Sequence, residues 1–370
     1  MRARLEPFGA WVRTNDATLV ALSRAGAKRL GLDGGELWRD PIEAASATRP
    51  RAPLEVHVAV TSRCAAGCTG CYLDARPDGD SPPFDELAAR LDAVAARGAF
   101  TVAFGGGEPL GRADLGELAA HARARGLVPV VTTSGLGMTA EKAARLAPFA
   151  QVNVSYDGVG AAYEGVRGFD GAAVAERAMA LLQAAGVPFG VNVVLTRGSF
   201  DALPETLARA EALGAREAQL LRYKPAGRAA SMTYLETRLT PEQVERLPRV
   251  LEEQSRTRSL SLRVDCALVP LLSGGDLDLD AEQLARFGVF GCEAGRHLEA
   301  LDVTGAPRPC SFAPEGADRG AWREPPSDAP CATCSIRAVC RGGCKVVARH
   351  VTGDLGPDPE CPRVRAHARA

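Results

Sequence analysis

Residues 64–71 read Cys-Ala-Ala-Gly-Cys-Thr-Gly-Cys and directly follow an alternating run at Glu55–Val60. Three thiols separated by three and by two residues, in a loop with two glycines, can converge on one iron–sulfur cluster. Three ligands leave one iron open to bind something else. A zinc site would need a fourth ligand, and none lies nearby; reduced structural thiols are the other alternative. The spacing favours a cluster at the end of this strand.

Strand-like runs alternate with helical segments from Leu54 to about Val264. The predicted strands are 55–60, 101–104, 128–132, 151–155, 188–195 and 217–221. The predicted helices lie near 84–94, 114–125, 139–147, 171–185 and 203–213, and a further one opens with a capping Thr240, Pro241 and Gln243. Six β-then-α repeats predict a parallel sheet with helices outside, either an open doubly wound sheet or a partial barrel. In both, active sites gather at the carboxyl ends of the strands.

The composition of the 370-residue chain divides it into three parts. Residues 1–52 are predicted to form a hairpin and a short helix, and residues 53–264 carry the βα repeats. Residues 265–370 are rich in Gly, Pro and Cys and are predicted to form a separate domain. This last part has too little apolar material to fold without cross-links, and metal is the obvious one.

Charge and cysteine usage exclude several classes of protein. With 44 basic and 45 acidic side chains, the chain offers no field to hold nucleic acid or an anionic membrane. No apolar run approaches the ~20 residues that cross a bilayer. Residues 1–6 lack the features of a signal peptide, so we expect a cytoplasmic protein. Eleven cysteines in a reducing compartment indicate metal or redox chemistry rather than disulfides.

The CxxxCxxC spacing after the first strand of a six-fold βα pattern resembles the radical SAM enzymes. In that family the three cysteines, here Cys64, Cys68 and Cys71, hold a [4Fe-4S] cluster whose open iron binds S-adenosylmethionine (SAM). The resemblance implies an α/β fold with a partial (β/α)6 TIM-like barrel. A small cysteine-rich SPASM domain, stapled by clusters, would follow the barrel.

Other stretches resemble the family's contacts to SAM. Phe104–Pro109 contains a match to the family's GGE motif for the methionine amino group, where glycines let the backbone approach a ligand. Asn153–Gly158 is similar to the family's S-x-D strand end. By resemblance, the cofactor-binding residues are Tyr72, Gly105, Gly106, Gly107, Glu108, Ser134, Ser155, Asp157 and Arg167. Asn192 and Arg222 match by position only, and Lys224–Arg228 resembles a family loop to which we assign no role.

Seven cysteines after residue 290 match the SPASM pattern. By resemblance, one auxiliary [4Fe-4S] cluster would be held by Cys331, Cys334, Cys340 and Cys361. The other would be held by Cys292, Cys310 and Cys344, which leaves it one ligand short, and Cys266 is the predicted fourth ligand. An inert or a functional thiol at Cys266 remains an alternative. Zinc is the alternative for the whole array.

The family's chemistry implies that a reduced cluster gives one electron to SAM. The resulting 5′-deoxyadenosyl radical takes a hydrogen atom from the substrate. We expect a net two-electron oxidation of a peptide or protein substrate, with three [4Fe-4S] clusters and a low-potential electron donor of the flavodoxin or ferredoxin type. The alternatives are maturation of a sulfatase-type protein, synthesis of a small cofactor, or, from another class, a non-catalytic iron–sulfur electron carrier or a zinc-stapled binding protein.

No acid or base for this chemistry stands out by its spacing. His57 alternates with Val56 and Val58 on the first predicted strand of the repeats, and we expect it to be a hydrogen-bonded interior residue rather than a ligand.

Overall fold

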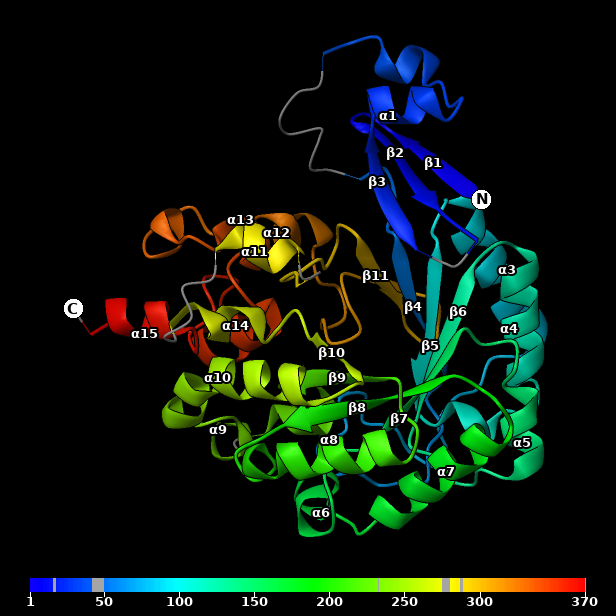
Figure 1. The fold of residues 1–370 in the computed structure, drawn as a ribbon, viewed down its shortest axis with the longest axis vertical. Helices are drawn as coiled ribbons and strands as arrows, with labels where there is room; N and C mark the ends of the chain where they lie inside the picture. The colour runs from blue at the N-terminus through cyan, green and yellow to red at the C-terminus, as the bar shows by residue number, and fades with distance from the viewer. Residues whose placement is uncertain (16–17, 42–49, 232, 275–279, 287–288, 370) are drawn as a thin grey trace.

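The computed structural model describes residues 1–15, 18–41, 50–231, 233–274, 280–286 and 289–369 (Figure 1). Its centre is a curved nine-stranded sheet with the strand order β10-β9-β8-β7-β6-β5-β4-β11-β12. All neighbouring strands are parallel except the β11–β12 pair. The strands are β4 Glu55–Thr61, β5 Thr101–Gly106, β6 Val128–Thr133, β7 Gln151–Ser155, β8 Phe189–Leu195, β9 Glu217–Arg222, β10 Ser261–Val264, β11 Leu298–Leu301 and β12 Pro307–Arg308.

The order of β4 to β10 follows the order of the chain without a reversal. A doubly wound sheet would reverse its order at a switch point, so the structure is the partial barrel of the two predicted alternatives. The six predicted strands are confirmed as β4 to β9, with their ends shifted by at most two residues. These strands could be recognised in the sequence because each either buries every second side chain or lies wholly in the core.

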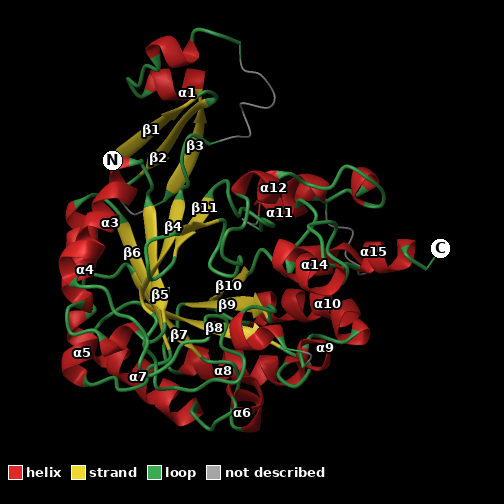
Figure 2. Ribbon diagram, turned by 180° about the vertical axis from the view of Figure 1, so that it is seen from behind, coloured by secondary structure: helices red, strands yellow, loops and turns green. Residues whose placement is uncertain are grey.

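Helices cover the outer face of the sheet (Figure 2). Along β4 the side chains of Val56, Val58 and Val60 are buried in the core beneath these helices, whereas Glu55 and His57 face the inside of the barrel. The helices of the barrel are α3 Phe84–Ala96, α4 Leu115–Ala124, α5 Ala140–Arg145, α6 Ala161–Arg167, α7 Ala172–Ala184, α8 Leu203–Ala212, α9 Tyr234–Thr237 and α10 Pro241–Thr257.

The predicted start of α10 is confirmed in detail. The Thr240 hydroxyl accepts from the backbone N–H of Gln243, and the Gln243 side chain accepts from the backbone N–H of Thr240. This reciprocal pair satisfies two donors that a helix start leaves unpaired. The short helix α6 was not predicted, because its seven residues between β7 and α7 show no apolar periodicity.

The N-terminal residues form a three-stranded antiparallel sheet. Its elements are β1 Arg2–Glu6, β2 Gly9–Arg13 and β3 Leu19–Ser23, followed by α1 Arg24–Arg29 and a 3-10 helix at Gly35–Trp38. Strands β2 and β3 pair over the residues predicted to form a hairpin. Strand β1 has no prediction because Arg2 and Arg4 interrupt its apolar pattern.

Those two arginines attach the small sheet to the barrel. The Arg2 guanidinium donates to the carbonyl of Gly126 at 2.8 Å and to that of Ala95 at 2.9 Å, at the ends of α4 and α3. Arg4 donates to the carbonyls of Pro53 and Gly98. Cations at the carboxyl ends of helices meet the negative end of the helix dipole and the unpaired carbonyls there.

The C-terminal residues lie beside the open edges of the barrel (Figure 1). Strand β11 pairs in parallel with β4, so part of the cysteine-rich segment continues the barrel sheet. The division of the chain near residues 52 and 264 therefore stays a prediction. The helices here are α11 Ala281–Arg286, α12 Arg319–Arg323, α13 Arg337–Cys340, α14 Lys345–Thr352 and α15 Pro362–His367, with 3-10 helices at Val269–Gly274 and Cys331–Thr333.

Glu299 on β11 is a fully buried carboxylate between the two parts of the chain. It accepts two hydrogen bonds from Arg97, the C-cap residue that follows α3, at 2.6 and 2.7 Å. It also forms an ion pair with Arg319 of α12. A bidentate arginine–carboxylate pair is among the stronger polar contacts in proteins, so Glu299 ties α12 and β11 to the barrel.

We predict that Glu299→Ala lowers the free energy of unfolding by about 2 kcal/mol, because it removes charge-assisted hydrogen bonds to two arginines. Urea unfolding followed by circular dichroism measures this change. The matched control is Glu141→Ala, whose ion pair with Arg145 is exposed on both sides and is worth less than about 0.5 kcal/mol. Equal decreases in the free energy of unfolding of the two variants would show that Glu299 does not stabilise the attachment of β11 and α12 to the barrel.

Candidate active site

The inner face of the curved sheet encloses a cavity of about 880 Å³. Side chains from every strand between β4 and β11 contribute to its wall, which shows that the sheet wraps around it. All twelve residues that the sequence predicts to hold the SAM cluster or SAM lie on this wall: Cys64, Cys68, Cys71, Tyr72, Gly105, Gly106, Gly107, Glu108, Ser134, Ser155, Asp157 and Arg167.

The loop after β4 brings the first three cysteines to the cavity half-buried. Among the described residues, no three Cys, His, Asp or Glu side chains converge closely enough to hold one metal ion. The assignment of these thiols to a cluster rather than to zinc rests on their spacing in the sequence.

The glycine turn after β5 packs against the strand that leads into the cysteine loop. A Cβ at Gly106, where φ is +117°, would lie 2.1 Å from the Thr61 carbonyl oxygen, and one at Gly107 would lie 2.2 Å from that of Arg63. The N–H of Gly107 donates to the Thr61 carbonyl at 2.7 Å. The close approach that demands glycine at 106 and 107 is thus to the protein's own backbone, in addition to the expected approach to a ligand.

Glu108 connects this turn to the end of β6. Its buried carboxylate accepts from the Thr133 hydroxyl at 2.6 Å, from the Ser134 N–H at 2.8 Å and from the Ser134 hydroxyl. The N–H of Leu110 donates to the same carboxylate at 3.0 Å. Two separate predicted SAM contacts, Glu108 and Ser134, therefore form one rigid unit on the cavity wall.

Asp157 connects the end of β7 to the cysteine loop. Its buried carboxylate pairs with Arg167 and accepts from the Val194 N–H at 2.7 Å. The Arg167 guanidinium in turn reaches the sulfur of Cys68 at 3.8 Å. Arg167 is thus an outer-shell partner of one of the predicted cluster ligands.

Asn192 leaves an acceptor unused on the cavity wall. Its amide nitrogen donates to Thr132 at 3.3 Å, whereas its Oδ1 is buried and has no hydrogen-bond partner within the described part of the chain. Ser155 stands beside it, in register on the neighbouring strand. Buried polar atoms are nearly always paired, so this oxygen fits a cavity that receives a ligand with N–H or O–H donors, such as SAM.

Tyr72, directly after the third cysteine, packs on the C-terminal segment. Its ring lies 4.6 Å from that of Phe312, with an interplanar angle of 38°. The Lys224 ammonium lies 4.3 Å from the centre of the Phe312 ring. The loop that carries the first three cysteines therefore contacts the segment around Cys310 through the rings of Tyr72 and Phe312.

His57 belongs to a hydrogen-bonded chain inside the same cavity. Its Nε2 lies 2.8 Å from Glu55 and its Nδ1 lies 2.8 Å from the hydroxyl of Ser311. Burial raises the pKa of Glu55, but the hydrogen bond and the charge of His57 outweigh it, so the pKa is lowered. A carboxylate only accepts, so Nε2 carries a hydrogen, and in the neutral imidazole Nδ1 accepts from the Ser311 hydroxyl. His57 is hydrogen-bonded as predicted, and it also faces the cavity with its partners.

The other eight cysteines fall into two groups by proximity. Burial, and after it the neighbouring charges of Cys292 and Cys344, raise the pKa of Cys310 to about 12. Burial, Asp265, and then Cys292 and Cys344 raise the pKa of Cys266 well above its ordinary value. The second group is Cys331, Cys334, Cys340 and Cys361, in which Cys361 and Cys334 act on both Cys331 and Cys340. These interactions agree with the predicted division into four and four, which stays a prediction.

Arg222 at the end of β9 holds the segment that carries two of these cysteines. Its buried guanidinium donates to Asp358 at 2.6 and 3.1 Å, to Glu360 at 2.8 Å and to the carbonyl of Ala267 at 2.9 Å. Asp358 also accepts from the N–H of Cys344 at 3.0 Å. Arg222 matches a SAM-side position in the sequence, but its donors are taken up by carboxylates from the end of the chain. No local spacing marks this pairing.

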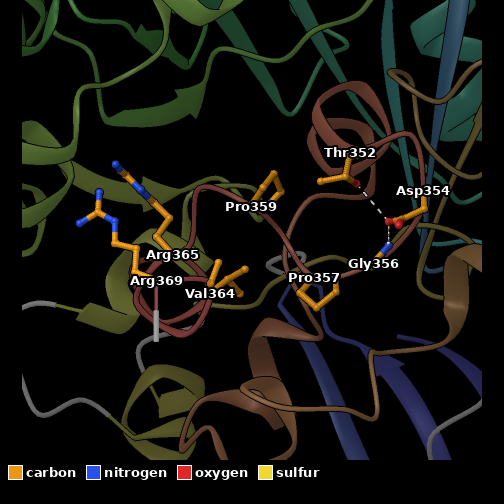
Figure 3. Close-up of a pocket in the computed structure, with 9 residues that line it drawn as sticks. Thr352, Asp354, Gly356, Pro357, Pro359, Val364, Arg365 and Arg369 are labelled. Carbon is orange, nitrogen blue, oxygen red and sulfur yellow. Dashed lines mark hydrogen bonds between the residues drawn. The ribbon is translucent and has the colours of Figure 1, made fainter.

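A second hollow, of about 450 Å³, lies between the end of α14 and α15 (Figure 3). Asp354 accepts there from the Thr352 hydroxyl and from the N–H of Gly356. None of the residues predicted to carry chemistry lines it. The larger cavity inside the barrel is therefore the candidate site.

The chain is similar to several known proteins. Residues 58–210 match the model of the radical SAM superfamily. The chain is 32% identical to mycofactocin maturase MftC of Mycobacterium ulcerans, covering 84% of this chain and 88% of the relative. It is 28% identical to the PqqA peptide cyclase of Rhodopseudomonas palustris, over 86% and 89% of the two chains. It is 25% identical to the AdoMet-dependent heme synthase of Nitratidesulfovibrio vulgaris, over 82% and 90%.

The crystal structure of Streptococcus suis SuiB bound to its precursor peptide SuiA has the same fold. The TM-score is 0.71 at 16% sequence identity, and the match covers 97% of this chain and 98% of that one. Within the described residues, no helix combines the length and the apolar character that a membrane crossing requires.

Proposed function

The chain belongs to the radical SAM superfamily, as an enzyme of its SPASM type, and from that premise we propose that it cleaves SAM reductively and oxidises a peptide or protein substrate by two electrons. Cys64, Cys68 and Cys71 would hold the [4Fe-4S] cluster. When bound, that cluster supplies the electron that cleaves SAM into methionine and a hydrogen-abstracting 5′-deoxyadenosyl group.

One observation carries the proposal: a single cavity wall gathers the three cysteines predicted to hold the SAM cluster and all the predicted SAM contacts, from five separate stretches of sequence. Chance would scatter them. Among these, Glu108 and Ser134 form one unit, Asp157 and Arg167 another, and the free Oδ1 of Asn192 faces the same space. The peptide substrate rests on the relatives, because a named peptide cyclase matches nearly the full chain.

The proposed oxidation removes one hydrogen atom, one electron and one proton from the substrate. The substrate loses one hydrogen atom to the 5′-deoxyadenosyl group. It then loses an electron to an acceptor, for which the two groups of four cysteines would hold auxiliary [4Fe-4S] clusters, and a proton to a base. The base is His57, reached through the hydroxyl of Ser311 and held by Glu55. The electron spent on SAM equals the electron released, and a low-potential donor of the flavodoxin or ferredoxin type starts the cycle.

One specific finding favours a second candidate function. The AdoMet-dependent heme synthase matches the chain over a similar length, so oxidation of a small cofactor precursor is the alternative substrate class. The polar chain at His57 would serve either substrate, because each two-electron oxidation releases a proton. The same assays separate them, with peptides or tetrapyrrole acids as the substrate.

We predict that the anaerobically reconstituted protein forms 5′-deoxyadenosine from SAM with dithionite, and that replacing Cys64, Cys68 and Cys71 together with Ala abolishes this product. About eight of about twelve irons should remain, since two auxiliary clusters are left intact. Chromatography and iron analysis measure both quantities. Peptides encoded by short reading frames next to the gene are the substrates to test, with a loss of two hydrogens by mass spectrometry as the readout.

Absence of 5′-deoxyadenosine from the unaltered protein would reject the SAM chemistry. Zinc in place of iron, or loss of all iron in the triple variant, would reject the division of the cysteines. Modification of a tetrapyrrole and of no peptide would move the chain to the second candidate function.

Cys266 tests the assignment of the first auxiliary group. We predict that Cys266→Ala alters the electron paramagnetic resonance spectrum of one auxiliary cluster and lowers its iron content, because this thiol lies with Cys292 and Cys344. The control is Cys266→Ser, which keeps a weaker oxygen ligand and should give a smaller loss. An unchanged spectrum and iron count in both variants would show that Cys266 is no ligand.

His57 tests the proton acceptor. We predict that His57→Phe lowers the yield of oxidised substrate per 5′-deoxyadenosine by roughly 100-fold, the lower range for loss of a general base. Formation of 5′-deoxyadenosine itself should persist, because hydrogen abstraction precedes proton release. The control is His121→Phe, a histidine that pairs with Asp92 and does not line the cavity. Equal ratios in the two variants would exclude His57.

A further inference from the structure

Residues 224–228 leave the end of β9 and pass over the cysteine loop. Gly227 has a φ of +56°, and a Cβ there would lie 2.5 Å from the carbonyl carbon of Tyr72 and 2.6 Å from the carbonyl oxygen of Cys71. Only glycine allows two backbones to approach this closely in that conformation. The two loops are therefore in direct backbone contact.

Arg228 makes the short hydrogen bonds to two of the cysteine carbonyls. Its backbone N–H donates to Cys71 at 2.9 Å, and its Nε donates to Cys68 at 3.0 Å. The loop's own bonds to these carbonyls, from the N–H groups of Cys71 and Asp74, are both 3.4 Å long. The tighter hold on both cysteines thus comes from outside their loop.

The same guanidinium also reaches the far side of the loop. Its Nη1 donates to the Asp74 carboxylate at 2.7 Å and to the carbonyl of Ala75 at 3.1 Å. One side chain therefore spans residues 68 to 75. The planar fork of arginine can bond several acceptors in fixed directions, which the single ammonium of lysine cannot do.

The other end of this loop is anchored in the C-terminal part of the chain. Arg222 is locked between Asp358 and Glu360, and Lys224 forms a buried ion pair with Asp265. The start of the segment that carries Arg228 is therefore held in place by ion pairs.

We propose that Arg228 is a positioning residue whose side chain presets Cys68, and with it the loop from Cys68 to Ala75, for the SAM-binding cluster. The inference rests on the part of the proposed function that places a cluster at the three cysteines, and it is independent of the substrate. Outer-shell partners of metal ligands typically contribute 10–100-fold to metal affinity. The loop at Lys224–Arg228, which the sequence left without a role, thereby acquires one.

The test uses the full-length reconstituted protein with all other residues unchanged. Arg228→Ala is expected to release iron from the SAM-binding site to a chelator roughly 10–100-fold faster than the unaltered protein. The change that SAM causes in the paramagnetic spectrum of the reduced cluster should weaken in parallel. The auxiliary irons, about eight per chain, should remain and report that the protein is folded.

The matched control is Arg76→Ala. Arg76 donates to the same Asp74 carboxylate at 2.9 Å, but its side chain bonds no cysteine carbonyl. It should release iron at the rate of the unaltered protein. Arg228→Lys separates charge from geometry, because it keeps the cation and loses the fork; it should release iron nearly as fast as Arg228→Ala.

Three outcomes would overturn the proposal: unchanged iron release in Arg228→Ala, full rescue by lysine, or equal loss of the auxiliary irons. Asp74→Asn, which weakens the anchor of the guanidinium, gives a second measure and should show an intermediate rate. A protein that never acquires a SAM-responsive cluster rejects the proposed function instead, so the two failures are distinct.

Discussion

The ion pairs of the buried Arg222 guanidinium with Asp358 and Glu360 fix the segment that carries Cys344 and Cys361 against the barrel. A charge buried without partners is strongly destabilising, and here two carboxylates and a carbonyl satisfy it. Asp358 also holds the backbone of Cys344, and Glu360 directly precedes Cys361. One side chain at the end of a barrel strand therefore fixes a member of each cysteine group. A segment poor in apolar residues gains its order from such contacts.

The barrel was predictable because its signals are local. Alternation along β4, the apolar period of α3 and the capping box of α10 each lie within a few residues, and each was confirmed. The cysteine spacings are local as well. The partners of polar side chains are different: Arg222 meets Asp358 across 136 residues, and His57 meets Ser311 across 254. Such pairs leave no pattern in the sequence, so the contacts of the proposed base and of Arg222 could be found only in the structure.

The interior of the barrel is polar at the end opposite the cysteines. Gln151 donates to Asn153 at 2.8 Å and to Glu217 at 3.0 Å, and Glu55 and His57 stand on the same inner face. A cavity of this kind desolvates amide groups at little loss, since it offers both donors and acceptors. It suits a peptide backbone better than an apolar ligand. The chemistry of the wall thus agrees with the substrate class indicated by the relatives.

The parallel pairing of β11 with β4 has a consequence for the newly made chain. Glu55 pairs with Leu298, which lies roughly 240 residues further along the chain. Strand β4 therefore lacks its second neighbouring strand until β11 has been synthesised. At ribosomal rates this interval lasts roughly 10–50 s. During that time the backbone edge of β4, next to the cysteine loop, has no strand beside it and can pair with other chains. The pairing with β11 therefore covers this edge only late in synthesis.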